Sequence, residues 1–419
     1  MTEKSTKPQL RFAGFDDTWE QREFSDIAET RRGLTYKPNS IVDNGVRVLR
    51  SSNINEDTFV FGNDDVFVDE NAVNIPYIQN GDILITSANG SSRLVGKHAI
   101  IRNLPDNSAV HGGFMLIASS SNPEFLNASM SSQWYSEFVS LYVAGGNGAI
   151  GNLNKNDLDT QIVLVPSVAE QRQIGSYFRN LDNLITLHQR KYDKLTNVKK
   201  SMLEKMFPKN GSNVPEIRFK GFSDAWEQRK LSDVATMHAR IGWQNLRTSE
   251  FLDSGDYMLI TGTDFNDGAV NYSTCHFVEK ERYEQDKHIQ IKNGSILITK
   301  DGTLGKVAYV QGLSMPATLN AGVFNVEIKD ETKVDNKYLF QYLKAPFLMD
   351  YVDKKATGGT IKHLNQNILV DFPVVMPSKA EQEAIGVYFQ QLDNLITLHQ
   401  RELEKLKNLK KACLEKMFV

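Results

Sequence analysis

Two glycine-rich polar loops that end in Gly-Lys occupy residues 87–97 and 300–306 of this 419-residue chain. Glycine and small hydroxyl side chains let a backbone approach phosphate oxygens closely, and the final lysine adds a positive charge, so these loops suit contact with a nucleic-acid backbone. An ordinary surface hairpin explains either loop equally well when the loop is considered alone. The presence of the same kind of loop in both halves of the chain favours the phosphate-binding interpretation.

Two other segments, residues 50–53 and 261–264, place polar side chains directly after a predicted strand. Arginine can donate two hydrogen bonds to guanine and asparagine can form two with adenine, so such side chains suit the reading of base edges. The same argument applies to Trp243, Asn245 and Arg247. The complete set of predicted DNA-binding residues is Arg50, Ser52, Asn53, Ser92, Arg93, Lys97, Asn154, Trp243, Asn245, Arg247, Thr261, Lys300, Thr303, Lys306, Lys362 and His363.

Motifs typical of catalysis are incomplete in this chain. Residues 74–77 resemble the Asn-Pro-Pro-Tyr box that holds the target amine in amino-methyltransferases, but an isoleucine replaces the first proline. Residues 90–97 resemble a phosphate-binding P-loop, but the spacing is one residue too long and His98 stands where a magnesium-binding hydroxyl is needed. Glu327 and Lys329 match half of a nuclease motif, for which a solvated strand edge is the better explanation. We therefore expect no catalysis by this chain alone, and no cofactor or metal ion bound by it.

Composition restricts the class of protein. The net charge of −3 argues against a DNA-binding surface that covers the whole molecule, although basic residues exceed acidic ones in residues 169–209. We therefore expect any DNA to be bound by local patches. No apolar run is long enough to cross a bilayer, residues 1–10 lack the apolar core of a signal peptide, and two cysteines cannot form a disulfide framework. These features predict a cytoplasmic protein without membrane contact.

The elements that must position these loops follow from an internal duplication. Residues 169–207 recur almost unchanged as residues 380–418, and in both copies apolar residues repeat at alternating spacings of three and four. This spacing is typical of the seam of a coiled coil. In each copy the seam is interrupted only by a histidine and a lysine, which are His188, Lys199, His399 and Lys410.

The two seam histidines favour a structural role over proton transfer or metal binding, because a polar residue on a coiled-coil seam commonly fixes the register. If the helices pair antiparallel, His188 should meet His399 at a pseudo-twofold axis.

A capping box precedes each long helix, since a serine stands three residues before a glutamate. The pairs are Ser167 with Glu170 and Ser378 with Glu381. We expect each serine hydroxyl and each glutamate carboxylate to accept a backbone N–H of the first turn.

The remaining sequence repeats less closely. Residues 10–28 are echoed by residues 217–235, and by symmetry the chain end at Val419 should lie near the N-terminal segment. Between these entry segments and the long helices, short apolar runs predict a mixed α/β globule in each half. The predicted strands are 83–86, 99–102, 114–118, 161–165, 296–299, 307–310, 323–328 and 369–376, and the predicted helices are 125–143 and 336–354, the second broken at Pro346. Because the helices agree while the globules differ, we expect the helices to bind one kind of partner twice and the globules to recognise two different targets.

At this point the motifs resemble a known family, the specificity subunits of type I restriction-modification systems. The resemblance extends over nearly the whole chain in the order and duplication of that family. It rests on Gly-Phe-x-x-x-Trp-Glu-Gln-Arg at 14–22 and 221–229, Pro-Ser-x-Ala-Glu-Gln at 166–171 and 377–382, and Leu-Asp-Asn-Leu-Ile-Thr-Leu-His-Gln-Arg at 181–190 and 392–401.

The resemblance implies two target-recognition domains, each binding one half of an asymmetric bipartite sequence in double-stranded DNA. It also implies a non-catalytic chain that recruits two methyltransferase subunits, which use S-adenosylmethionine, and up to two restriction subunits, which use ATP and Mg²⁺. The negative net charge departs from expectation and suggests that partner subunits supply part of the contact with phosphates. A non-catalytic scaffold with two protein-binding domains is the alternative.

The expected fold class is α/β, with two mixed α/β target-recognition domains in pseudo-twofold duplication. Each domain is followed by a long helix, and the two helices pair as an antiparallel coiled coil. The expected boundaries are 1–166 for the first target-recognition domain, 167–208 for the first helix, 209–215 for a linker, 216–377 for the second domain and 378–419 for the second helix.

Overall fold

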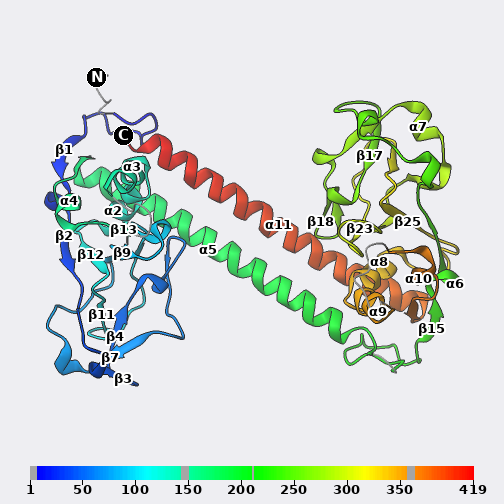
Figure 1. Ribbon diagram of the computed structural model, residues 1–419, viewed down its shortest axis with the longest axis horizontal. Helices are drawn as coiled ribbons and strands as arrows, with labels where there is room; N and C mark the ends of the chain where they lie inside the picture. Colours follow the sequence, from blue (N-terminus) through cyan, green and yellow to red (C-terminus); the bar gives the residue numbers. More distant parts are fainter. Residues whose placement is uncertain (1–6, 143–150, 210–211, 356–363) are drawn as a thin grey trace. The chain divides into compact units, whose positions relative to one another are not determined.

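The computed structural model describes residues 7–142, 151–209, 212–355 and 364–419. The chain forms two compact units: a first unit of residues 1–189 and 400–419, and a second unit of residues 190–399. Two long helices, α5 (Val168–Lys205) and α11 (Lys379–Met417), run from one unit into the other (Figure 1). Each unit therefore contains a segment of both helices, and each unit is described by itself below.

The first unit contains two four-stranded sheets. The first is antiparallel with the order β10-β8-β12-β2, and the second has the order β11-β4-β7-β3. In the second sheet β11 runs parallel to β4, so the carboxyl ends of these two strands lie at the same edge. The strands are β2 (Glu29–Arg32), β3 (Ile41–Val42), β4 (Val46–Leu49), β7 (Val66–Val68), β8 (Ile83–Thr86), β10 (His98–Ile100), β11 (Ala109–His111) and β12 (Met115–Ser119).

The segment 125–143 was predicted as one helix, but its described residues form two: α2 (Pro123–Met130) and α3 (Gln133–Tyr142). Residue 143 lies outside the described residues. The interruption falls at two serines whose hydroxyls bond back to carbonyls of the preceding turn. Ser131 Oγ donates to the Asn127 carbonyl at 2.9 Å, and Ser132 Oγ donates to the Ser129 carbonyl at 2.7 Å. Such bonds compete with the backbone ladder, which is why a uniformly apolar spacing did not reveal the break.

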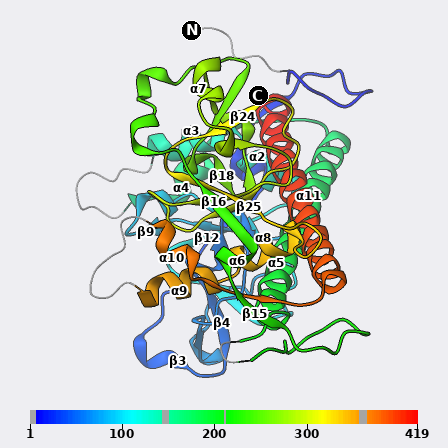
Figure 2. The same ribbon diagram turned by 90° about the vertical axis from the view of Figure 1, so that its right-hand side faces the viewer.

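The second unit repeats this design with a larger first sheet. Its sheets have the orders β16-β25-β22-β23-β19-β18 and β20-β17-β24-β21, and β17 runs parallel to β24. Figure 2 shows this unit from the side on which β16 and β25 are visible. The strands are β16 (Ala235–His238), β17 (Tyr257–Ile260), β18 (Phe265–Asn266), β19 (Ala269–Val270), β20 (His276–Val278), β21 (Gln290–Ile291), β22 (Ile296–Thr299), β23 (Val307–Tyr309), β24 (Ala317–Leu319) and β25 (Val323–Ile328).

The helix predicted for residues 336–354 of the second unit largely agrees with the structure. The predicted break at Pro346 is confirmed, because α8 (Asn336–Lys344) ends before it and α9 (Phe347–Lys355) begins after it. The predicted strand 369–376 is partly wrong: its first residues belong to α10 (Gln366–Val370), and only β26 (Pro373–Met376) is a strand.

A two-stranded ribbon joins the start and the end of each globule. In the first unit β1 (Glu20–Glu23) pairs antiparallel with β14 (Ile162–Val165). In the second unit β15 (Glu227–Lys230) pairs with β26 in the same way. The Glu-Gln-Arg part of the entry motif therefore lies in the strand that joins each globule to the segment leading into its long helix.

Within each unit the segments of α5 and α11 pack in opposite directions. In the first unit Tyr177 Oη lies 3.3 Å from Cys413 Sγ, whereas Asp182, further along α5, contacts Lys410, which is earlier in α11. The seam residues belong to the core of the unit. The members from both helices are Ile174, Phe178, Leu181, Cys413 and Met417.

The seam lysines have acidic partners, which explains their presence at apolar positions. Lys410 Nζ lies 2.9 Å from Asp182 Oδ1 in the first unit. In the second unit Lys199 forms the equivalent ion pair with Asp393, whose other oxygen accepts from Gln341 Nε2 at 2.8 Å. Lys199 is only 7% exposed, and its place on the seam is tolerated because its charge is paired with a carboxylate.

The start of each long helix differs from the predicted capping box. The serine part is confirmed: Ser167 Oγ accepts the N–H of Glu170 at 3.4 Å, and residues 378 and 381 repeat the contact. The glutamate part is wrong, because both carboxylates bind an arginine of the entry segment instead. Arg11 donates to Glu170 at 2.7 and 2.8 Å, and Arg218 donates to Glu381 at the same distances.

The chain end lies beside the N-terminal segment, as the duplication predicted. In the first unit the Leu10 N–H donates to the Lys416 carbonyl at 2.9 Å, and the rings of Trp19 and Phe418 have centroids 6.0 Å apart. The second unit makes the same contacts within a continuous chain: Ile217 donates to Lys205 at 2.9 Å, and Trp226 lies 6.4 Å from Phe207.

Buried histidines make the first unit sensitive to acid. Burial lowers the pKa of His111 to about 4, although its Nε2 lies 3.1 Å from the Arg31 carbonyl. An unfolded histidine has a pKa of about 6.5, so between these values the unfolded chain binds more protons and stability falls as the pH falls. The expected loss from pH 6.5 to 4 is about 3 kcal/mol for this group.

The second unit supplies the control, because Leu319 occupies the position equivalent to His111 in the parallel strand pair. We expect His111→Leu to reduce the acid sensitivity of the first unit and to leave the part due to His98, whose pKa is also lowered by burial. The measurement is urea unfolding or hydrogen exchange at pH 7 and pH 4.5. An unchanged pH dependence in this variant would show that other groups cause it.

Candidate nucleic-acid interface

The predicted base-reading segments lie at the same topological position in both units. Residues 50–53 follow β4 in the first unit, and residues 261–264 follow β17 in the second. In both units the last residue of this strand accepts a hydrogen bond from the residue that follows the parallel partner strand. The Gly112 N–H, after β11, donates to the Leu49 carbonyl, and the Asn320 N–H, after β24, donates to the Ile260 carbonyl, each at 2.9 Å. The carboxyl ends of a parallel strand pair thus form a shared edge from which polar loops project.

The glycine-rich loops reach the same edge. In the first unit the Ser87 N–H donates to the Phe114 carbonyl at 2.9 Å, and the Leu153 N–H donates to the Ser87 carbonyl at 2.7 Å. A short ribbon extends this contact, because β9 (Ala88–Asn89) pairs with β13 (Gly151–Asn152).

The second unit repeats the arrangement with different side chains. Its Lys300 N–H donates to the Gly322 carbonyl at 2.9 Å, and the Leu364 N–H donates to the Lys300 carbonyl at 2.8 Å. The backbone frame is common to both units, whereas Ser87 and Phe114 of the first unit are replaced by a lysine and a glycine.

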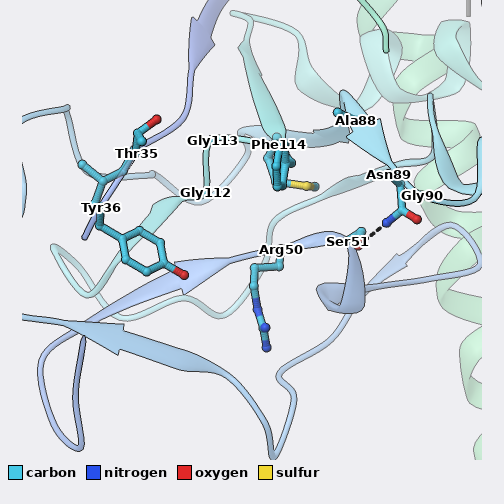
Figure 3. Close-up of a pocket in the computed structure, with 12 residues that line it drawn as sticks. Thr35, Tyr36, Arg50, Ser51, Ala88, Asn89, Gly90, Gly112, Gly113 and Phe114 are labelled. Carbon is cyan, nitrogen blue, oxygen red and sulfur yellow. Dashed lines mark hydrogen bonds between the residues drawn. The ribbon is translucent and has the colours of Figure 1, made fainter. Parts of the chain in front are cut away.

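In the first unit this edge is hollowed into an open pocket of about 650 Å³, which we call the strand-edge pocket (Figure 3). Phe114, one of the residues that line this pocket, is 68% exposed. Exposed aromatic rings bordered by polar groups commonly mark binding surfaces. The pocket is lined by Leu34, Thr35, Tyr36, Arg50, Ser51, Ala88, Asn89, Gly90, Gly112, Gly113, Phe114 and Met115.

Arg50 is the cationic member of the strand-edge pocket. Its Nη2 donates to the Asp64 carbonyl at 2.6 Å, which orients the guanidinium and leaves its side chain 36% exposed. Its Nε has no hydrogen-bond partner among the residues that the structure describes. This Nε is buried, so contact with a guanine edge or a phosphate would use the exposed part of the guanidinium, and Phe114 of the same pocket suits apolar contact with a thymine methyl group.

Asn53 requires a correction, because its side chain is fully buried and cannot reach a base. Its Nδ2 donates to the Val60 carbonyl and to Asp65, and its Oδ1 accepts the N–H of Arg50 at 2.8 Å. Asn53 therefore positions Arg50. Asp264 has the same role in the second unit, where it accepts the N–H of Thr261 at 2.8 Å.

The other predicted residues lie mainly on accessible surface. Asn154 caps the short helix α4 (Lys155–Asp159) by accepting the Asn156 N–H at 3.2 Å, which occupies only its carbonyl oxygen. Lys362 and His363 lie outside the described residues, as does the side chain of Trp243. Exposed members are Ser52, Ser92, Arg93, Asn154, Asn245, Arg247, Thr303 and Lys306, and half-buried members are Arg50, Lys97, Thr261 and Lys300.

The sequence analysis named the loop that contains Asn89 but assigned no binding role to seven other residues that line the pocket, which are Leu34, Thr35, Tyr36, Gly112, Gly113, Phe114 and Met115. Asn89 donates to Ser51 Oγ at 3.0 Å and thereby joins the glycine-rich loop to the segment after β4. Phe114 was predicted to begin a strand, but β12 begins one residue later and Phe114 faces outward. The two glycines before it were the available signal of a turn.

A buried arginine, also missed, holds the predicted segment 242–247 of the second unit. Arg240 is 1% exposed, and its Nε donates to the Leu319 carbonyl at 3.0 Å while Nη1 donates to Gln285 at 3.1 Å. Burial lowers the pKa of Arg240 from its usual value. Nη1 also donates to the Gln244 carbonyl at 3.4 Å, so Arg240 attaches the 3₁₀ turn Gly242–Gln244 to Leu319 at the end of β24.

A family model described as the type I restriction modification DNA specificity domain matches residues 16–197 and again residues 223–408. The chain belongs to this family. Each match includes one set of sheets with its strand-edge loops and most of the long helix that follows. The chain is thus a type I specificity subunit with two target-recognition domains of mixed α/β structure.

Two relatives come from Methanocaldococcus jannaschii. The type I restriction enzyme MjaVIII specificity subunit is 24% identical over 275 residues, which span 62% of each chain. The putative MjaX specificity subunit is 24% identical over 411 residues, covering 94% of this chain and 91% of the relative. This chain shares its fold with the crystal structure of a type I restriction-modification S subunit from M. genitalium. The TM-score is 0.60, the sequence identity is 16%, and the match covers 99% of each chain.

None of the described helices is long and apolar enough to span a membrane.

Phe114→Ala is expected to weaken recognition of one half of the DNA target by about 1.5–3 kcal/mol, the usual contribution of burying a large apolar side chain. The measurement is the affinity of the assembled methyltransferase for target DNA and for DNA altered in either half. Phe61→Ala is a suitable control, because that ring is also exposed but lies outside the strand-edge pocket. Equal losses in the two variants would contradict a specific role for the pocket.

Proposed function

We propose that this specificity subunit reads a bipartite asymmetric DNA sequence, with one half-site bound at the strand-edge loops of each target-recognition domain. The observation that carries the proposal is the repeated backbone frame with unlike side chains. Arg50 and Phe114 occupy one frame, and Thr261 and Gly322 occupy the other. A common frame keeps the approach to DNA the same, while different side chains select different bases.

The proposed functional boundaries follow the duplicated motifs. Residues 1–166 and 216–377 would recognise DNA, residues 167–208 and 378–419 would form the connecting helices, and residues 209–215 would link the halves. Since the incomplete motifs suit no reaction, we propose that the chain is not itself an enzyme. S-adenosylmethionine, ATP and Mg²⁺ would be bound by partner subunits.

The two long helices are proposed to pair along their length as an antiparallel coiled coil, with His188 and His399 fixing the register. The opposite directions of the helix segments within each unit support this arrangement. The 39 residues of α11 correspond to about 58 Å at about 1.5 Å per residue. This length exceeds the roughly 34–36 Å of one DNA turn, so unread base pairs can separate the two half-sites.

Repeated exposed leucines on the helices support docking of two copies of one methyltransferase subunit. Leu184 and Leu187 on α5 are 44% and 46% exposed, and Leu395 and Leu398 at the equivalent positions of α11 are 44% and 51% exposed. Each pair is one helical turn apart and forms an apolar stripe, of the kind that binds a partner. Up to two restriction subunits would join the same complex.

The proposed function is tested by measuring DNA binding by the chain with and without its methyltransferase partner at several salt concentrations. We expect weak binding by the chain alone and strong binding by the complex, with an affinity that falls linearly in a log-log plot against salt. Labelled S-adenosylmethionine should methylate DNA only when the partner is present. Salt-independent binding would favour the protein-binding scaffold, and methylation without the partner would show that the chain is an enzyme.

A further inference from the structure

We propose that the second unit binds one divalent transition-metal ion, of which Zn²⁺ is the best example, through His238, His288 and Glu327. These side chains each offer a ligand atom, and the three atoms lie within 4.8 Å of one another. Two imidazoles and one carboxylate form a ligand set that zinc uses with a fourth position left open. Calcium and magnesium prefer oxygen ligands, so the two histidines favour a transition metal.

The three residues are far apart in sequence, but the sheets bring them together. His238 ends β16, and Glu327 lies on β25, the strand paired with it. His288 belongs to the 3₁₀ turn Lys287–Ile289, which leads into β21 of the other sheet. An ion at this site would therefore connect the two sheets of the second unit.

The side chains lie close enough to share an ion after rotation about their side-chain bonds, since the two histidine rings are stacked with an interplanar angle of 19°. His238 Nε2 lies 3.8 Å from Glu327 Oε2, and the rings of His238 and His288 have centroids 4.5 Å apart. Two ligands of tetrahedral zinc at about 2.0–2.1 Å from the metal are about 3.3 Å apart. Rotation of exposed side chains can close this difference, since Glu327 is 54% exposed at its side chain.

Neighbouring groups hold the site in position. Asn325, directly opposite His238 in the strand register, donates to the His288 carbonyl at 3.0 Å. The His288 N–H donates to Asp286 at 2.9 Å, so both bonds fix the backbone of His288 beside β25. Thr236 Oγ1 lies 3.1 Å from His238 Nε2, and this contact would be replaced by the ion if that nitrogen is the ligand.

The site borders a pocket of about 420 Å³, which leaves room for a water molecule or another ligand in the open position. Asp286 in this pocket adds negative charge near the ion. The nearby cation, Lys329, donates to the Ser232 carbonyl, so its ammonium group has a partner away from the three ligands.

The first unit provides an independent argument, because a fixed cation occupies the corresponding place. The strand registers align Arg31 with His238 and Ser119 with Glu327. Arg31 Nη2 donates to Asp82 at 3.0 Å and to Ser119 at 3.1 Å, which joins β2 to β12 and to the residue before β8. In the second unit His238 stands in place of this arginine, and a bound metal ion would restore a positive charge between β16 and β25.

The test uses the full chain, freed of metal with a chelator and titrated with Zn²⁺ in equilibrium dialysis or with Co²⁺ by visible absorption. We expect one ion per chain, and affinity at least about tenfold lower in His288→Ala and in Glu327→Gln. His276→Ala is the matched control, because His276 is exposed on β20 of the same unit but is not part of the cluster. Its affinity should equal that of the unmodified chain.

The stability of the second unit gives a second measurement. A ligand that binds only the folded state stabilises it, so saturating Zn²⁺ should slow hydrogen exchange at β16, β25 and residues 287–291 in the unmodified chain but not in His288→Ala. Absence of saturable binding, or equal binding by His288→Ala and the unmodified chain, would overturn the proposal. Neither measurement involves DNA, so the result is independent of the proposed function.

Discussion

Replacing Arg218 with alanine is expected to lower the free energy of unfolding of the second unit by about 3–5 kcal/mol. The reason is the carboxylate of Glu381, which is 1% exposed and receives bonds of 2.7 and 2.8 Å from the Arg218 guanidinium. Removal of the arginine leaves a buried charge without its main partner. The loss should appear in urea unfolding and as faster hydrogen exchange of the second unit.

Two variants separate this effect from the loss of any surface ion pair. Arg229 and Glu227 form a 2.7 Å pair, but their side chains are 46% and 68% exposed, so Arg229→Ala should cost less than about 1 kcal/mol. Arg11→Ala should reproduce the large effect in the first unit, where Glu170 has no exposed surface. If Arg218→Ala and Arg229→Ala destabilise equally, the interpretation of the entry segment as a buried clasp is wrong.

The double variant Leu395→Glu with Leu398→Glu is expected to remove one of two docked methyltransferase subunits. Burial of a leucine contributes about 1.5–3 kcal/mol, so loss of two weakens binding by more than about a hundredfold even before the added charges are considered. Native mass spectrometry of the assembled complex should then show one methyltransferase copy in place of two. The matched pair Leu184→Glu with Leu187→Glu should remove the other copy.

Leu409→Glu is the control for this experiment, because Leu409 is 43% exposed on α11 but lies outside the repeated pairs. It should leave two methyltransferase copies bound. A complex that keeps both copies in the Leu395 and Leu398 double variant would show that the repeated leucines do not form the docking surface.

The strongly periodic parts of the fold were predictable from the sequence. The repeated sequence reveals the duplication. The spacing of apolar residues predicts both long helices and the buried strands β8 and β22, because the same residues that favour each element locally also form its buried face. The break at residues 131–132 was not predictable in this way, because it depends on serine hydroxyls that bond to backbone carbonyls. The partners of Glu170 and Glu381 were missed because an arginine more than a hundred residues away replaces the local backbone donor.

The candidate site was predicted at the level of loops and less well at the level of side chains. The sequence identified the segments after β4 and β17 and the two glycine-rich loops. Within each unit, the structure brings one such segment and one such loop to the same sheet edge. It gave Asn53 a base-reading role, although this amide is buried beneath the loop that it supports. Phe114 was missed because an aromatic residue beside a strand is usually part of the core, and only the tertiary structure shows it at the surface.

The central claim is that each target-recognition domain reads its own half-site. The most direct test replaces residues 216–372 with the corresponding segment of another specificity subunit and maps methylated adenines across genomic DNA from cells carrying either chain. The account predicts that one half of the methylated sequence changes while the other half, read by the first domain, stays the same. A change in both halves, or in neither, would contradict it.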